Sequence, residues 1–327
     1  MQAVIRRYFP GIALATAIAL LARLVDQGGF GSGLLFALLF GMLARPLAET
    51  PIAAAGVDFS GQHLLAVAVA LLGVRLSVSD VAAIGLWPAI VVAAGVAATI
   101  AFGVFAARLL GLSLTLGLIA GSGTAFCGAS AAVAVAAALP RKTGLERDTA
   151  LVIAGVVALS AIAMVLYPLL AIFLDFDDLR AGIFLGGSIH NVPQAVAAGM
   201  AVSEAAGSTA TLTKLFRISL LAPFVLALAI AVGRRAGASH SWLQVPWFVL
   251  AFAILLVAGS FDIIPAALKS ALLGISGWLM LVAVAAIGMR TSLEAMRTIG
   301  GSVLLLLIAN SFVLAAFLLI AIRFGAL

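Results

Sequence analysis

The sequence predicts an all-α membrane protein, and its composition and its long apolar runs are the observations that predict it. Of 327 residues, 65% are hydrophobic and 9% are charged, with 18 lysines and arginines and 12 aspartates and glutamates. A soluble domain averages about 45–50% apolar and about 25% charged residues. Because so few charges cannot cover a soluble globule of this length, the excess apolar residues must face lipid. The runs lack the two-residue alternation of barrel strands, which favours helices.

Eleven apolar runs are candidate transmembrane helices, since a helix needs roughly 20 residues to cross the hydrocarbon core. Two arginines precede the first run, but no strong small-residue cleavage site follows, so this run is interpreted as an uncleaved first helix. A re-entrant segment would change the count by one, which gives about 10–11 helices. The runs are Phe9–Val25, Phe30–Ala44, His63–Leu76, Ile84–Leu110, Leu112–Leu139, Thr149–Leu174, Leu179–Val202, Ser208–Val232, Val245–Phe261, Ala266–Met289 and Gly301–Arg323.

Charged residues between the runs give part of the topology. Lysine and arginine favour cytoplasmic loops, which applies to Arg6, Arg7 and the loop Arg141–Arg147. The acidic loop Asp175–Asp178 is the best external candidate. With eleven full spans, however, the Arg141 loop falls on the opposite side from Arg6 and Arg7. Either one segment does not cross fully, or that loop breaks the bias.

Two segments, Leu64–Gly85 and Leu279–Gly300, resemble each other at 10 of 22 aligned positions, including a shared Gly-x-Arg-x-Ser. They belong to the third and tenth runs, so they cross the membrane in opposite directions. Inverted repeats of this kind are typical of secondary transporters. The alternative is a shared helix end that places an arginine at the headgroups, and Arg75 and Arg290 are interpreted as such anchors. Residues 1–327 are therefore expected to form a single transmembrane transporter domain.

Two further segments, Ile119–Ser130 and Leu185–Gln194, interrupt apolar runs with glycine and hydroxyl residues, and the second also contains Pro193. Such clusters allow a helix to break, and exposed backbone at membrane depth is tolerated only where it lines a cavity or is buried in protein. Two breaks in comparable positions point to a substrate site. Close helix packing through small residues is the alternative.

Two cations and one histidine are the side chains most suited to binding. Lys214 and Arg217 lie three residues apart inside an apolar run, so they share one helix face. An intramembrane cation marks a functional site by default, although both side chains could instead extend to the interface. His190 can be a satisfied packing residue or can carry a coupling proton. Cys127 has no second cysteine, so it is expected to be a small residue at the break rather than a metal ligand or nucleophile.

Helix N-termini with arginine and neutral donors favour a small oxyanion, such as sulfate, a sulfonate or a carboxylate, over a metal cation. All twelve acidic residues lie in loops or at run ends. Cation carriers usually place a carboxylate deep in the bundle, so this placement counts against a Na⁺/H⁺ antiporter. The predicted substrate-binding residues are Ser122, Thr124, Cys127, Gly128, Ser130, Ser188, His190, Asn191, Gln194, Lys214 and Arg217.

The motifs resemble the YeiH-type sulfate exporter family over nearly the whole chain, from about Pro10. The resemblance rests on Gly121–Ala131, Gly187–Gly199 and Lys214-x-x-Arg217. It implies a multi-pass protein of the bacterial inner membrane within the wider group of cation/proton antiporters and anion transporters, with inverted repeats and two crossing, broken helices. Many relatives have His-Glu-Val-Ala-Gln where this chain has His190–Gln194. The missing glutamate puts proton coupling through that position in doubt. The usual Ser-Ile-Cys-Gly is Ala125–Gly128 here, which can reshape the first break.

The sequence therefore predicts a secondary active transporter of a small anion that works by alternating access, with a Na⁺/H⁺ or other cation/proton antiporter as the alternative. A non-transporting membrane sensor or subunit is a third reading. An enzyme is least favoured, because no nucleophile–base pair, metal constellation or Walker loop is present. We expect no cofactor and no nucleic-acid partner. The expected partners are the anion, the lipid bilayer and a coupling ion, H⁺ or Na⁺. A homo-oligomer, the substrate and the direction of transport stay open.

Overall fold

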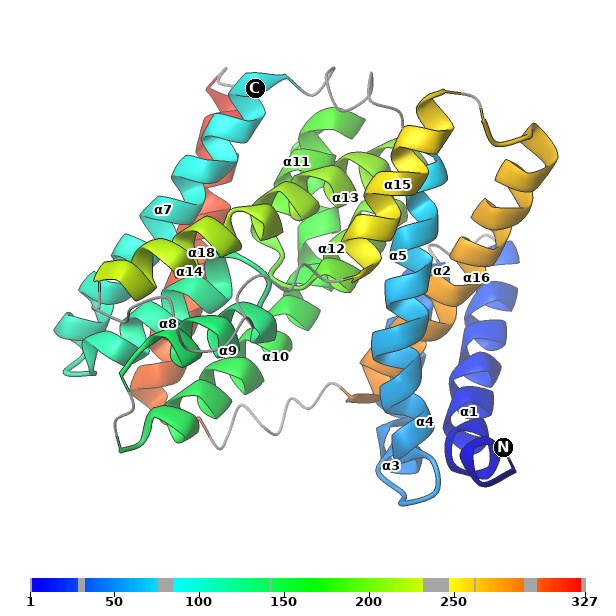
Figure 1. Cartoon of the computed structure of the whole chain (residues 1–327), viewed down its shortest axis with the longest axis horizontal. Helices are drawn as coiled ribbons and strands as arrows, with labels where there is room; N and C mark the ends of the chain where they lie inside the picture. The colour runs from blue at the N-terminus through cyan, green and yellow to red at the C-terminus, as the bar shows by residue number, and fades with distance from the viewer. Residues whose placement is uncertain are drawn as a thin grey trace. The chain divides into compact units, whose positions relative to one another are not determined.

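The computed structural model describes residues 2–28, 33–75, 85–140, 143–231, 247–261, 263–290 and 299–324. Most of these residues are helical, and no strand is present among them (Figure 1). Each of the eleven predicted runs contains helix, so the all-α, multi-spanning prediction is confirmed. Seven of the described helices are long and apolar enough to cross a membrane. They are Arg7–Gln27, Ala54–Arg75, Leu86–Leu109, Leu145–Phe173, Glu204–Leu228, Ala266–Arg290 and Gly301–Arg323.

The chain divides into two compact units. Unit 1 comprises Met1–Ile84, Met200–Ser208 and Val245–Ser292. Unit 2 comprises Gly85–Gly199, Thr209–Gln244 and Leu293–Leu327. The first turn of one helix, α13 (Glu204–Ser219), belongs to unit 1, and the rest of it belongs to unit 2.

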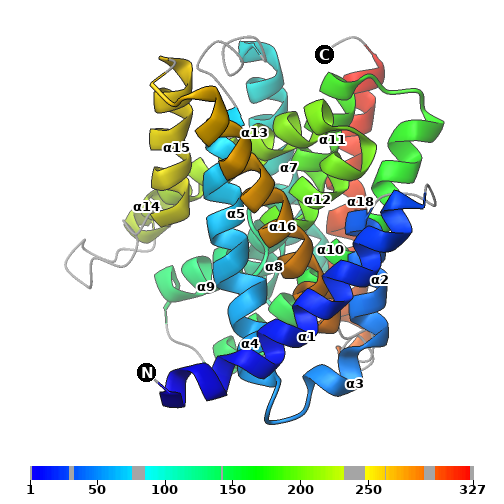
Figure 2. The ribbon, with the colours of Figure 1, turned by 90° about the vertical axis from the view of Figure 1, so that its right-hand side faces the viewer.

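In unit 1, α1 (Gln2–Gln27) and α2 (Gly33–Leu43) pack beside α16 (Ala266–Arg290) (Figure 2). A short helix, α3 (Arg45–Ala48), follows α2. The span Ala54–Arg75 comprises α4 (Ala54–Phe59), a wider turn (Ser60–Leu64), α5 (Leu65–Leu72) and a tighter last turn (Gly73–Arg75). It packs against α16 and α15 (Trp247–Ser260). Within unit 1, therefore, the two repeat-related segments are direct neighbours.

The repeat-related glycines and arginines of unit 1 make corresponding contacts. A Cβ added at Gly73 would lie 2.3 Å from the carbonyl oxygen of Phe252 in α15, and one added at Gly288 would lie 2.3 Å from that of Leu38 in α2. Both glycines thus allow another helix backbone to approach closely. Arg75 pairs with Glu204, and Arg290 pairs with Asp58 at 2.7 Å. Both arginines, which the sequence predicts to be interface anchors, therefore also form ion pairs within unit 1. Positions 76–84 and 291–298 of the repeat lie outside the described residues.

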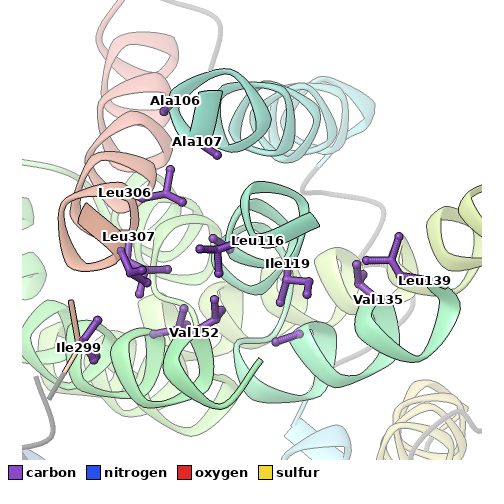
Figure 3. Close-up of a cluster of buried hydrophobic side chains, with 14 of the residues drawn as sticks. Ala106, Ala107, Leu116, Ile119, Val135, Leu139, Val152, Ile299, Leu306 and Leu307 are labelled. Carbon is purple, nitrogen blue, oxygen red and sulfur yellow. The ribbon is translucent and has the colours of Figure 1, made fainter. Parts of the chain in front are cut away.

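Unit 2 is built around α8 (Leu114–Ala125), which packs on α7 (Leu86–Leu109), α10 (Leu145–Phe173) and α18 (Gly301–Arg323). Its core joins Leu116 and Ile119 of α8 to Val152 of α10 and Leu307 of α18 (Figure 3). The outward faces of α7, α10 and α18 carry exposed phenylalanine, leucine and isoleucine side chains, as expected of surfaces that meet lipid.

The two predicted breaks are present in unit 2. The run Leu112–Leu139 is split into α8 and α9 (Ala129–Ala138), and the run Leu179–Val202 is split into α11 (Asp178–Ser188) and α12 (Val192–Val202). The run predicted from Ser208 begins earlier, at Glu204, where a carboxylate in the first turn suits the positive end of the helix dipole. It continues into α14 (Leu221–Ala231).

Candidate functional site

The first break spans Phe126–Gly128, between α8 and α9. Gly128 has φ +68° and ψ −120°, a conformation that only glycine adopts easily. A Cβ at this position would also lie 2.3 Å from Oδ1 of Asn191. Both the backbone conformation and the space beside it therefore require the glycine.

The second break spans Ile189–Asn191, between α11 and α12. Ile189 is extended, with φ −69° and ψ 138°, so it ends α11. Pro193 lies in the first turn of α12, where a missing N–H costs no intrahelical hydrogen bond. The backbone N–H of Asn191 donates to Oγ of Ser160 in α10 at 3.1 Å, which holds the break against a neighbouring helix.

The two breaks lie against each other. Nδ1 of His190 is 3.2 Å from the carbonyl oxygen of Thr124, at the end of α8. Nε2 of the same ring is 2.9 Å from Oγ of Ser311 in α18. Asn191 lies against Gly128. The structure therefore brings together the two segments in which the sequence predicts helix breaks.

Lys214 and Arg217, both in α13, are fully buried, so the alternative in which they extend to the interface is wrong. Nε of Arg217 donates to Ala125 O at 2.8 Å, and its terminal nitrogens donate to Thr124, Ala125, Gly186, Gly187 and Ile189 carbonyls. Nζ of Lys214 donates to Phe126 O at 2.8 Å and Ile189 O at 2.5 Å.

These acceptors are the carbonyl groups at the C-terminal ends of α8 and α11. The last carbonyls of a helix have no intrahelical N–H partner, and they form the negative end of the helix dipole. The two buried cations of α13 supply the missing donors to both ends and balance the partial charge. Lys214 and Arg217 thus hold the two breaks together, and within the described chain their hydrogen bonds go to backbone carbonyls.

The hydroxyl groups among the predicted site residues differ in their hydrogen-bond partners and in their exposure. Thr124 donates to Ala120 O at 2.9 Å and Ser188 donates to Phe184 O at 2.6 Å, so each is occupied within its own helix. Ser122 is buried, and its Oγ has no partner among the described residues. Ser130 is exposed on α9, and Cys127 is partly buried in the first break.

At the N-terminal end of α12, Asn191 and Gln194 form a neutral pair. Nδ2 of Asn191 donates to Oε1 of Gln194 at 3.0 Å. Gln194 is 1% exposed, and its Nε2 has no partner among the described residues. A buried amide N–H₂ without an acceptor is costly, so this group is a donor that is available to a ligand.

Three buried polar side chains of α10 and α18 are absent from the predicted set. Ser160 of α10 and Ser311 of α18 contact Asn191 and His190, and Asn310 is buried with neither side-chain amide atom bonded within the described chain. The signal that could have found two of them is the Asn310–Ser311 pair inside an otherwise apolar run, because polar side chains in spans usually face other helices.

Comparison with known proteins identifies the family. The family model described as Conserved hypothetical protein 698 matches residues 10–307. The UPF0324 membrane protein TauZ of Paracoccus denitrificans is 40% identical over 327 residues, covering 98% of this chain and 97% of the relative. A UPF0324 membrane protein of Rhizobium meliloti (strain 1021) is 38% identical, covering 98% and 94%. One of Chlorobaculum tepidum is 35% identical, covering 96% and 88%.

No solved structure matches the chain. The matches extend over nearly its full length, and the relatives are named as membrane proteins, in agreement with the apolar helices of the structure. The chain therefore belongs to the family of UPF0324 membrane proteins, which confirms the family resemblance indicated by its motifs.

Proposed function

We propose that this protein is a secondary active transporter of a small anion, sulfate or a related oxyanion or sulfonate. The anion would bind at the N-terminal ends of α9 and α12. The observation that carries the proposal is an imbalance of charge at the two breaks. The negative C-terminal ends of α8 and α11 are balanced by Lys214 and Arg217, whereas α9 and α12 have no acidic residue in their first turns to balance their positive N-terminal ends.

Free backbone donors support an anion at these ends. In α9 the first intrahelical bond is donated by Ala132, and in α12 it is donated by Ala195. The N–H groups of the residues before them have no partner within their helices; among them, that of Ala131 is bonded to the side chain of Cys127, and Pro193 has no N–H to offer. Each end also carries about half a positive charge from the helix dipole, which makes it a ready site for an oxyanion.

The neutral side chains at the site also favour an anion. Gln194 presents an amide N–H₂ that lacks an acceptor among the described residues. The side chain of Asn191 is neutral, so it offers no negative charge that would attract Na⁺ to this position. A cation here would face two positive helix ends whose first turns carry no carboxylate to offset them.

Broken helices suit alternating access, because each break exposes backbone groups partway across the membrane, where they can bind a polar solute. The anion would be bound between the breaks and released when the surrounding helices open to the other side. Two observations support this mode of transport: the two breaks lie against each other, and several of the described helices are long and apolar enough to span a membrane.

The proposal is tested by Gln194→Glu, which places a carboxylate at the position that the anion would occupy. We expect sulfate affinity to fall at least about tenfold, while the melting temperature without ligand stays near the wild-type value, because the helix end stabilises the new charge. The measurements are sulfate-dependent thermal shift in detergent and uptake of labelled sulfate by proteoliposomes. Gln27→Glu, at the exposed end of α1, is the matched control.

Two results would contradict the proposal. In the first, Na⁺ or Li⁺ raises the melting temperature of the wild type, whereas none of the anions changes it. The anions to be tested are sulfate, sulfite, sulfonates and small carboxylates. This first result would favour cation transport. The other is Gln194→Glu binding the anion as tightly as the wild type, which would place the site elsewhere.

A further inference from the structure

His190 is a buried imidazole with both ring nitrogens in hydrogen-bond contact. Nδ1 is 3.2 Å from Thr124 O, which can only accept a hydrogen bond. Nε2 is 2.9 Å from Oγ of Ser311, and the same Oγ is 2.8 Å from Leu307 O, which also can only accept. Three contacts therefore depend on the protons of one imidazole and one hydroxyl group.

The protonation state of the ring decides how many of these three contacts can be hydrogen bonds at once. If only Nε2 carries a proton, Ser311 can donate to Leu307, but a bare Nδ1 faces the Thr124 carbonyl. If only Nδ1 carries a proton, the Ser311 hydroxyl must turn to Nε2 and leave Leu307. With both nitrogens protonated, all three contacts are hydrogen bonds at the same time. The environment thus provides acceptors for an imidazolium, as well as a donor for the neutral ring.

A positive charge on His190 would nevertheless lie beside two other cations. The Thr124 carbonyl that faces Nδ1 also accepts from Arg217 at 2.9 Å. Lys214 donates to the carbonyl of Ile189, the residue just before His190. Like charges at such short range repel each other, so the imidazolium is unfavourable in the absence of a compensating anion.

No other described group near the ring supplies that compensation. The segments α8, α9 and α12 contain no acidic residue, and the acid of α11 lies in its first turn, ten residues before Ser188. Of the other helices that contact the breaks, α18 contains no acidic residue, and the acidic residues of α10 and α13 lie in the first turns of those helices. The uncharged groups at the breaks include the hydroxyl group of Ser311, which contacts His190, that of Ser160, which contacts Asn191, and the thiol of Cys127.

We propose that His190 is the coupling-proton site and that it binds its proton together with the transported anion. This inference rests on the proposed anion site. A proton from solution adds to the lone pair of Nε2, and the Ser311 hydroxyl turns back to Leu307. The added positive charge is offset by the negative charge of the anion. Linkage is reciprocal, so the anion must favour the proton as much as the proton favours the anion. Proton and anion therefore move in the same direction, as in symport.

The test compares the pH dependence of sulfate affinity in the wild type and in His190→Gln. Glutamine keeps a hydrogen-bonding side chain but cannot take up a proton. Between about pH 5.5 and about pH 8.5, the wild-type Kd should rise with pH, approaching tenfold per unit where the free ring is neutral. The variant should show a flat profile. His63→Gln, at an exposed histidine of the span Ala54–Arg75, is the matched control and should keep the wild-type slope.

A second measurement does not depend on a variant that must fold. Calorimetry of sulfate binding to the wild type in buffers of different ionisation enthalpy should show uptake of about one proton per sulfate at the upper end of the pH range. A flat wild-type profile with no proton uptake would overturn the inference and leave the anion site standing.

Two further outcomes would also overturn the proposal. If the sulfate Kd still rises with pH in His190→Gln but no longer does so in Lys214→Gln, the proton would be assigned to the lysine. Absence of sulfate, sulfonate and carboxylate binding at every pH, with the protein folded, would instead reject the proposed function itself.

Discussion

Lys214 and Arg217 are buried cations whose hydrogen bonds, within the described chain, all go to backbone carbonyls. A buried charge without partners is too costly to keep, so these contacts explain how two cations can be fully buried. The two side chains also lock the ends of two broken helices to one face of a third. Their primary contribution is therefore to position the site, whereas the free donors of the site belong to α9, α12 and Gln194.

At the same scale, Gly128→Ala tests whether the first break depends on one residue. The alanine must adopt φ near +68° and must also displace Asn191, so we expect a loss of at least about 3 kcal/mol in stability. Gly144→Ala is the matched control, because Gly144 has φ +88° but nothing within 4 Å of an added Cβ. It should lose roughly 1–2 kcal/mol.

Denaturation of both variants in detergent measures these losses. The double variant Gly128→Ala/Asn191→Ala should recover part of the loss, since the close contact is removed while the unfavourable backbone angle remains. Equal losses for Gly128→Ala and Gly144→Ala would mean that the contact with Asn191 contributes nothing.

At the scale of elements, the helix breaks could be predicted from sequence and their partners could not. Glycine clusters and Pro193 are local signals, and both predicted breaks are present. The contacts of Arg217 join positions 28 to 93 residues apart, and their acceptors are backbone carbonyls, which have no sequence signature. For the same reason the interface alternative for the two cations stayed open until the packing of α13 was known.

The packing of α2 against α16 depends on a glycine at Gly288. An alanine there would place its Cβ 2.3 Å from Leu38 O, so the two helices must separate. We expect Gly288→Ala to cost about 1–3 kcal/mol, as overpacking does elsewhere. Gly277→Ala in the same helix is the matched control, because nothing lies within 4 Å of its added Cβ, and it should cause no loss. Thermal unfolding in detergent distinguishes the two, and a Gly288→Ala protein as stable as Gly277→Ala would contradict the close approach.

At the scale of the whole molecule, composition alone predicts a membrane protein, because the chain has too few charged residues to cover a surface that faces water. The repeat-related segments could be found because Gly73, Arg75, Gly288 and Arg290 stand out against alanine, valine and leucine. Their acidic partners, Glu204 and Asp58, could not be assigned, since an ion pair between distant segments has no local signal. A single transporter domain formed by both units stays a prediction.

The orientation of α10 in the membrane follows from the charges at its two ends. Its 29 residues are long enough to cross the bilayer, so we expect Thr143 and Asp178 to lie on opposite sides. Basic residues precede the helix and acidic residues follow it, so we predict that Thr143 lies in the cytoplasm and Asp178 outside. The only cysteine is Cys127, so Cys127→Ser provides a background without thiols.

In that background, Asp178→Cys in intact cells should react with a membrane-impermeant maleimide, and Thr143→Cys should react only after the membrane is opened. The labels report the side of each end directly, because both positions are exposed in the structure. Labelling of both ends from one side would show that α10 does not span. Labelling in the reverse order would show that the basic loop before α10 is external, and that this loop breaks the positive-inside bias.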